Sequence, residues 1–256
     1  MPIKPQSMKW DKLVSSQISL WEFRKKLEEK QPQKDANNPW HKAHITISRS
    51  YGAKGYEIAK ILGRKLHWEV YSRNLVEYIS ETSNVRNRLV ETFDEKTKSE
   101  IQNWVHTLLD SQVMTTDKYF KHLASVLMTI EEHGQAIVVG RGANFLFNHE
   151  IGLHVRITAS LEWRVAHVAE KWGISEKDAK KLVNKHDSDR LAFIRRYYQM
   201  DADDPTAYDL VVNIERLTLE KVAEIILSAL EIRLGMPRPE KKELEESNQP
   251  DHPRED

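Results

Sequence analysis

The loop over residues 49–56 (RSYGAKGY) carries the residue types that a phosphate-binding turn uses. Its small residues would let backbone N–H groups close around an anion at the start of the helix that follows. The loop departs from the pattern G-x-x-x-x-G-K-S/T, because Arg49 takes the first position and the Gly-Lys pair is reversed as Lys54-Gly55. No Ser or Thr follows that pair. Taken alone, the loop fits either a phosphate site or an ordinary turn between a strand and a helix.

Arginines stand at two further places where they could neutralise a phosphate. Arg141 follows an apolar run (136–140), and a guanidinium is a natural bidentate partner of a phosphate, although a surface ion pair is the alternative. Within the charge-rich stretch 162–196, Asp187 and Arg190 are three residues apart, so they share a helix face and can pair. Phosphoryl transfer needs positioning and charge neutralisation more than covalent chemistry, so these placements favour phosphate chemistry.

Several other function classes are excluded. The 256 residues include no Cys, which excludes a thiol nucleophile and a zinc finger. No H-x-x-x-H or H-E-x-x-H pattern occurs, so we expect no metal site built from side chains. No G-x-S-x-G pattern occurs either, so we expect no serine nucleophile elbow. Equal numbers of basic and acidic residues, 39 each, argue against a protein that coats nucleic acid. No apolar run reaches the roughly 18 residues of a membrane span, so we expect a cytoplasmic protein without membrane or nucleic-acid partners.

The elements that must position these residues alternate between short apolar runs and helical patterns. Such alternation predicts an α/β fold with a five-stranded parallel sheet covered on both faces. In such a sheet the carboxyl ends of the strands meet at one edge, where the loop over 49–56 and Arg141 would come together. The predicted strands are 43–48, 68–72, 136–140, 153–158 and 208–214.

The two ends of the chain differ from the centre. An amphipathic helix is predicted over 11–30, and its tryptophans either bind a protein partner or pack back onto the domain. The last segment is rich in Pro and acidic residues and is predicted to be disordered. The chain is therefore divided into an N-terminal helix with its linker, a central domain and a tail, which are residues 1–40, 41–235 and 236–256.

Five stretches, in this order and spacing, resemble the cytidylate kinase-like family, a divergent branch of the nucleoside monophosphate kinases. They are ITISRSYGAKGYEIAKILGRKL, VYSRNLVEYISE, AIVVGRGANFLF, HVRITASLEWRVAHVAEKWGISEKDAKKLVNKHDSDRLAFIRRYYQMD and YDLVVNIERLTLEKVAEII. The resemblance covers about residues 43–232. It implies a three-layer P-loop NTPase-type fold, ATP and Mg²⁺ as cofactors, and a small-molecule nucleotide as the partner. It also implies a helical acceptor-binding insertion at 73–133 and a lid region at 160–200.

The resemblance also assigns roles to residues near the strand ends. The branch carries S-R-x-Y-G-x-x-G after its first strand and commonly lacks the P-loop Lys. Here Lys54 takes a slot that is usually Gly, and Tyr56 one that is often basic. In CMP kinases a Gly-Arg-Asp binds the acceptor; Arg141 matches its Arg, but Gly142 replaces the Asp, so cytosine selectivity is not implied. Arg73, just after the second strand, is the expected acceptor contact in the insertion.

The lid of CMP kinases carries a D-x-x-R whose Arg helps to stabilise the transferring phosphoryl group, and HDSDR resembles it. Arg195 lies roughly 140° around a continuous helix from Arg190, so it can join Arg190 only if the helix bends or breaks. The catalytic residues implied by the resemblance are Lys54, Arg164, Asp187, Arg190 and Arg195. The implied nucleotide-binding residues are Arg49, Ser50, Tyr51, Gly52, Ala53, Lys54, Gly55, Tyr56, Arg73 and Arg141.

Three functions are compatible with these residues. The first is a phosphotransferase that moves the γ-phosphoryl group of ATP to CMP or a related small acceptor. The second is a catalytically impaired relative that binds nucleotide and acts as a sensor, because the loop is degenerate. The third is an interaction protein that works through residues 1–40.

Overall fold

The computed structural model describes residues 5–30, 38–110 and 117–239 of the chain. Its centre is a sheet of five parallel strands in the order β2-β3-β1-β4-β5. The strands are β1 (His44–Arg49), β2 (Glu69–Tyr71), β3 (Ala136–Val139), β4 (Gly152–Thr158) and β5 (Leu210–Asn213). Each strand overlaps the apolar run that predicts it, and the predicted α/β fold with a five-stranded parallel sheet is confirmed.

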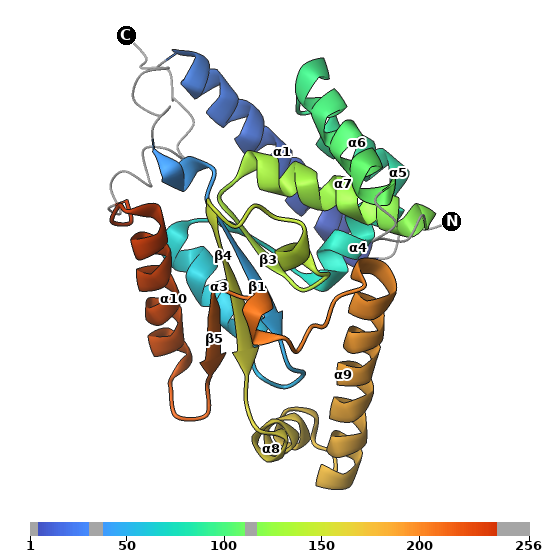
Figure 1. Cartoon of the computed structure of the whole chain (residues 1–256), viewed down its shortest axis with the longest axis vertical. Helices are drawn as coiled ribbons and strands as arrows, with labels where there is room; N and C mark the ends of the chain where they lie inside the picture. Colours follow the sequence, from blue (N-terminus) through green and yellow to red (C-terminus); the bar gives the residue numbers. More distant parts are fainter. Residues whose placement is uncertain (1–4, 31–37, 111–116, 240–256) are drawn as a thin grey trace.

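The sheet is covered by helices on both faces. Ile47 of β1 packs into a core with α3 (Gly55–Leu66) and α10 (Leu219–Leu234). Val138 of β3 packs into a second core on the other face, with α7 (Lys118–His133). Figure 1 shows α10 and α3 on one side of the sheet and α7 on the other. Because successive residues of a strand point to opposite faces, apolar strands of this kind are buried on both sides.

The segment 73–133, predicted to be almost entirely helical, forms a helical insertion between β2 and β3. Its first helix begins after Ser72, whose Oγ accepts the N–H of Leu75 at 3.3 Å and so caps the helix. In the described part of the insertion the helices are α4 (Arg73–Glu81), α5 (Ser83–Val90), α6 (Glu95–Asp110) and α7.

Two helices follow β4 on the side of the sheet where the strands end (Figure 1). They are α8 (Leu161–Trp172) and α9 (Glu176–Tyr198), and α9 is continuous along its length. Each is capped by a serine, Ser160 before α8 and Ser175 before α9, a residue type that commonly caps helices. Three short 3-10 helices complete the described elements: η1 (Pro39–His41), η2 (Ala143–Phe145) and η3 (Pro205–Ala207).

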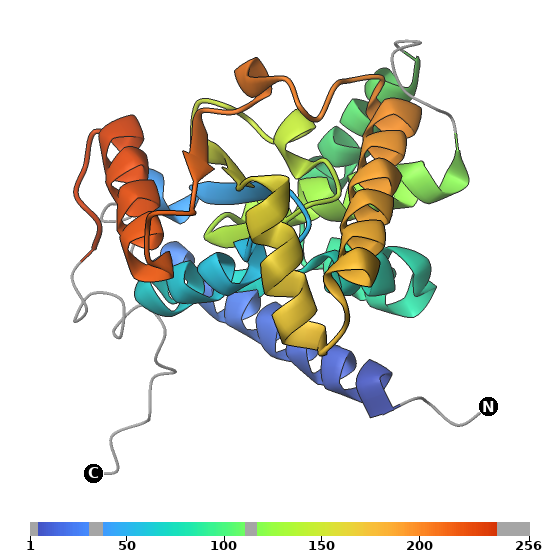
Figure 2. The same cartoon turned by 90° about the horizontal axis from the view of Figure 1, so that it is seen from below.

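The N-terminal helix α1 (Pro5–Lys30) packs on the insertion and contacts α4 and α5. Val14, Ile18 and Trp21 are buried there, and the ring of Trp21 stacks on His133 with 3.6 Å between centroids. Figure 2 shows α1 running along one side of the molecule. The tryptophan side chains of the N-terminal extension therefore pack onto the chain itself.

Two sequence predictions fall largely outside the described residues, namely the linker over 31–39 and the disordered tail over 236–256. Across the described helices, none combines the length and the apolar character that a bilayer span requires.

Candidate functional site

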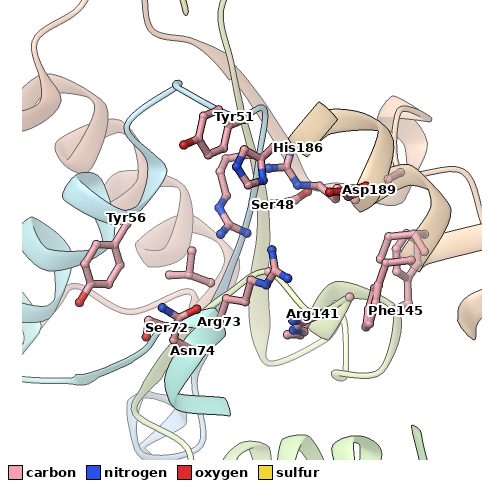
Figure 3. Close-up of a pocket in the computed structure, with 18 of the residues that line it drawn as sticks. Ser48, Tyr51, Tyr56, Ser72, Arg73, Asn74, Arg141, Phe145, His186 and Asp189 are labelled. Carbon is pink, nitrogen blue, oxygen red and sulfur yellow. The ribbon is translucent and has the colours of Figure 1, made fainter. Parts of the chain in front are cut away.

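A cavity of about 500 Å³ opens where the carboxyl ends of β1 and β3 meet (Figure 3). The turns after these two strands, the start of α4 and the inner face of α9 surround it. The charged side chains in its lining are Arg49, Arg73, Arg141, Arg190 and Asp189, together with His186. In the described part of the chain, four guanidinium groups thus face a single carboxylate across this cavity. We call it the larger cavity below.

Arg49, the last residue of β1, passes its side chain between two glycines. A Cβ on Gly55 would lie 2.9 Å from the Cβ of Arg49, and a Cβ on Gly140 would overlap its Nη1 atom. No carboxylate of the described residues forms an ion pair with Arg49. Burial, together with three neighbouring arginines, lowers the pKa of Arg49 to about 9. A buried guanidinium that lacks a carboxylate is suited to bind an anion.

Arg73 and Arg141 reach the larger cavity from different elements and share one carboxylate (Figure 3). The Nε of Arg73 lies 3.6 Å from Oε2 of Glu77, and Arg141 pairs with Oε1 of the same side chain. The Cζ of Arg141 also lies 4.6 Å from the centre of the Phe193 ring. Burial, and next the charge of Arg73, lower the pKa of Arg141 to about 10. Two guanidiniums on one carboxylate leave a net positive charge for a ligand.

The turn after β3 explains why a glycine follows Arg141. Gly142 has a φ of +70°, and a Cβ there would overlap the ring of Tyr198. The Tyr198 hydroxyl donates a hydrogen bond to the carbonyl oxygen of Arg141. An Asp in place of Gly142, as in the Gly-Arg-Asp of CMP kinases, would therefore clash with the Tyr198 ring.

Asp187 links α9 to the loop after β1 through hydrogen bonds. Its Oδ1 accepts the N–H of Tyr51 at 2.8 Å and an N–H of Arg190 at 3.1 Å. Its Oδ2 accepts an N–H of Arg164 at 2.5 Å, and Arg164 also donates to the carbonyl oxygen of Tyr51 at 3.1 Å. The ring of Tyr51 stacks on His186, with 4.2 Å between centroids. One carboxylate thus fixes two guanidiniums and the loop backbone.

A second cavity of about 190 Å³ runs along the other side of the loop, between the loop and α8. We call it the smaller cavity. The two cavities share Arg49, Tyr51, Tyr56 and Arg190 in their linings. The start of α3 also faces the smaller cavity, and the first N–H groups of a helix have no partner within the helix. Two guanidiniums therefore stand on the boundary between two cavities that can each take an anion.

The structure places most of the predicted site residues around these two cavities. The smaller cavity is lined by Ser50, Gly52, Lys54 and Gly55 of the loop. The side chain of Ala53, also in the loop, is buried in the core. The amine of Lys54 lies 5.3 Å from the centre of the Trp163 ring, away from the larger cavity.

Arg195 is the predicted residue that the structure does not bring to the site. It is exposed and lines neither the larger nor the smaller cavity. The reason is the continuity of α9, which neither bends nor breaks between Arg190 and Arg195.

Sequence reasoning did not find Arg156 of β4. Its Nη1 donates to Oγ of Ser48 at 3.3 Å, and it pairs with Asp203. With Arg164, Asp187 and Arg190 it lines a small space of about 110 Å³ behind the loop. An Arg inside an otherwise apolar strand is a signal that could have identified it, because a buried charge needs a partner.

Two places in the described structure carry side chains that could bind a metal ion. Asp189 lines the larger cavity and forms no ion pair among the described residues. A separate group of possible ligands, His149, His154 and Asp209, lies near the opposite ends of the strands. There Asp209 already pairs with Arg233 and accepts the N–H of His154 at 2.7 Å.

Comparisons with known proteins agree on one family. Residues 44–216 match the sequence model of the cytidylate kinase-like family, so the match begins after α1. The chain is 24% identical over 189 residues to a cytidylate kinase of Thermoplasma acidophilum, covering 73% of this chain and 92% of that protein. A cytidylate kinase of Archaeoglobus fulgidus is 27% identical over 193 residues, covering 74% and 95%.

Two further matches are more limited. A cytidylate kinase of Sulfolobus acidocaldarius is 31% identical over 102 residues, so the chain spans only 56% of that enzyme and 40% of itself. Among solved structures, an uncharacterized protein from Eubacterium ventriosum superposes with a TM-score of 0.51 at 17% identity. That superposition covers 74% of this chain and 98% of the other chain, and it shows a similar fold.

Proposed function

Because this chain belongs to the cytidylate kinase-like family, we propose that it is an ATP-dependent phosphotransferase acting on CMP or a related nucleoside monophosphate. One observation carries the proposal, namely that Arg49 and Arg190 line both cavities. A donor in the smaller cavity and an acceptor in the larger cavity would present the transferring group to the same two guanidiniums. Charge neutralisation at that point is what phosphoryl transfer needs most.

The smaller cavity suits the phosphates of ATP, which supplies the phosphoryl group. Arg49 has no carboxylate partner among the described residues, and the first N–H groups of α3, which Lys54 does not cap, face this cavity. Arg49 comes from the first position of the loop, and Gly55 leaves the space through which its side chain passes. In this proposal Arg49 supplies the positive charge that a P-loop usually takes from a lysine. Lys54 then contacts ATP at the outer edge of the smaller cavity.

The larger cavity would hold the acceptor phosphate between Arg73 and Arg141. These two guanidiniums are only half neutralised by Glu77, so a phosphate would complete their ion pairs. An oxygen of the acceptor phosphate then attacks the γ-phosphorus, and the bond from that phosphorus to the β–γ bridging oxygen breaks. ADP leaves with the bridging oxygen, and no covalent intermediate with the protein is required.

Asp187 and Arg164 act on this step by orienting Arg190. The Asp187 carboxylate holds Arg190 and the loop backbone together, so the guanidinium is fixed where negative charge is spread in the transition state. Asp189 is the carboxylate available in the lining for Mg²⁺, an ion that binds mainly through phosphate and water oxygens with one or two carboxylates. Mg²⁺ carried by ATP would further neutralise the phosphates.

A coupled ADP-release assay over a panel of nucleoside monophosphates tests the proposal. Arg190→Ala is expected to lower kcat by about 10²- to 10³-fold, as is typical for losing one group that stabilises transition-state charge. Arg64→Ala, at an exposed position of α3, is the matched control and is expected to leave kcat unchanged. Turnover of no acceptor, or equal turnover in the two variants, would contradict the proposal.

A second candidate is a nucleotide sensor without turnover. It is favoured by Tyr56, which stands where a P-loop hydroxyl would contact Mg²⁺, and by the Lys54 amine on Trp163. This candidate predicts nucleotide affinity in calorimetry with no ADP release. Absence of nucleotide binding would contradict both candidates.

A further inference from the structure

The N-terminal helix α1 lies outside the segment that matches the family, yet it contributes to the larger cavity. Trp10, near the start of α1, lines that cavity together with residues of α4 and α9. One wall of the cavity is therefore supplied by an element that the family match does not include.

The position of Trp10 is fixed by the rest of α1. Trp10, Val14, Ile18 and Trp21 follow one another at helical spacing, so they form one stripe on the helix. The last three are buried in the core of the insertion, and Oγ of Ser15 accepts an N–H of Arg88 at 3.0 Å. Trp10 continues the stripe past the core and reaches the cavity.

The surroundings of Trp10 are aromatic on one side and polar on the other. Its ring packs against Tyr78 of α4, with 5.2 Å between centroids and an angle of 57°. Asn74 lies one helical turn before Tyr78 and lines the same cavity, and its amide makes no hydrogen bond among the described residues. A cavity lined by both a flat indole and an amide suits a planar ring with a polar edge.

The start of α4 and Trp10 meet at one cavity. Arg73, which would hold the acceptor phosphate, begins α4 and lines the larger cavity together with Trp10. A phosphate on Arg73 and a base on Trp10 would therefore occupy the same cavity. The other aromatic side chains of the lining include Phe193, whose face is covered by the Arg141 guanidinium.

We propose that Trp10 is an acceptor-binding residue on which the base of a nucleoside monophosphate stacks, while Arg73 and Arg141 hold its phosphate. This inference rests on the proposed function for the identity of the larger cavity as the acceptor site. It assigns the acceptor to the nucleotides, in place of phosphate esters that lack an aromatic ring. The N-terminal helix then takes part in substrate selection.

The test uses the full-length chain, the monophosphates of cytidine, uridine, adenosine and guanosine, and ribose 5-phosphate, which lacks a base. Calorimetry without ATP gives each Kd, and the coupled assay gives each KM. For the best-bound nucleotide, Trp10→Ala is expected to raise Kd and KM by about 5- to 150-fold, the range for losing one base–aromatic stack. The KM for ATP and the Kd for ribose 5-phosphate should not change.

Two further variants separate stacking from a structural role. Trp10→Phe keeps a stacking face, so it should retain most of the affinity but lose the quenching of tryptophan fluorescence by nucleotide. Lys12→Ala, at an exposed position on the same helix, should leave every constant unchanged. Val14→Ala should lower Tm, but because Ile18 and Trp21 still hold α1 in the core it should raise Kd less than Trp10→Ala does.

The outcomes distinguish this inference from the proposed function. Unchanged nucleotide affinity in a folded Trp10→Ala variant, an equal loss for ribose 5-phosphate, or an equal loss in Val14→Ala would overturn the inference and leave the phosphotransferase proposal standing. Nucleotide binding that depends on Trp10 without turnover of any acceptor would retain the inference and overturn phosphoryl transfer. Binding of none of the four nucleotides would overturn both.

Discussion

Among single residues, Arg49 has the most unusual environment. Its side chain fits only because Gly55 and Gly140 lack a Cβ, and its charge has no carboxylate partner among the described residues. A chain keeps a buried, unpaired charge at a cost in stability, and functional sites are where such costs are usually found. The stability of the protein and its proposed activity should therefore respond in opposite directions when this charge is removed.

Arg49→Met should separate these two responses. Methionine has a similar length without a charge, so the free energy of unfolding is expected to rise by about 1 to 3 kcal/mol in the absence of ligand. Phosphoryl transfer is expected to fall by about 10²-fold or more, because a charge at the boundary of the two cavities is lost. Urea unfolding and the coupled assay measure the two effects. Arg64→Met is the control, and a less stable Arg49→Met would contradict the argument.

Sequence predicts the residues of the site unevenly, for physical reasons. The loop over 49–56 can be recognised because its glycines and its arginine are adjacent in the chain. Trp10 could not be placed in the same way, because its partners are distant in sequence and no local pattern identifies them. Arg156 has a local signal, a charge within a largely apolar strand, but its partners Ser48 and Asp203 are distant in sequence. The role of Gly142 depends on Tyr198, which approaches it only in the folded protein.

At the scale of elements, the glycines that end strands and helices show what local sequence decides. Gly173 and Gly235 end α8 and α10 in left-handed conformations, and a glycine after an amphipathic stretch is a local signal of a helix end. The apolar residues over 55–66 recur at regular helical spacing, and this segment forms α3. The internal breaks of the insertion were not predicted, because its four helices share one continuous helical pattern and their ends depend on tertiary packing.

Two glycines with nearly the same backbone angle allow a matched comparison. Gly142 and Gly173 have φ values of +70° and +62°, but only at Gly142 would a Cβ overlap a neighbour, the Tyr198 ring. Gly173→Ala is expected to cost about 1 kcal/mol from its backbone angle alone. Gly142→Ala adds overpacking and is expected to cost roughly 2 to 5 kcal/mol in urea unfolding. Equal costs would show that Tyr198 moves aside freely.

For the whole molecule, one buried carboxylate sets a pH dependence that can be measured. Glu131 of α7 is 7% exposed and accepts the N–H of Asn148. Burial raises its pKa from 4.5 to about 7. The folded state therefore binds the proton more tightly than the unfolded state between these values. The stability that this proton contributes is fully present below pH 4.5 and is lost as the pH rises through 7.

Glu131→Gln replaces the carboxyl by a neutral group of the same shape. The variant is expected to match the parent protein near pH 4.5 and to exceed its free energy of unfolding by up to about 3 kcal/mol above pH 7. Urea unfolding at several pH values measures the difference. Glu91→Gln, at an exposed position of the same insertion, should show no such trend. A constant difference across pH would exclude titration of Glu131 as the cause.

The docking of α1 has a consequence for how the protein is made. Val14 and Ile18 are synthesised before the helices on which they pack, which follow β2. Trp21 can stack on His133 only after the end of α7 has been synthesised. At typical translation rates the intervening chain takes roughly 5 to 20 seconds to appear. During that interval the apolar stripe of α1, with two tryptophans, remains exposed on the nascent chain. This helix therefore docks only after elements that are made later have appeared.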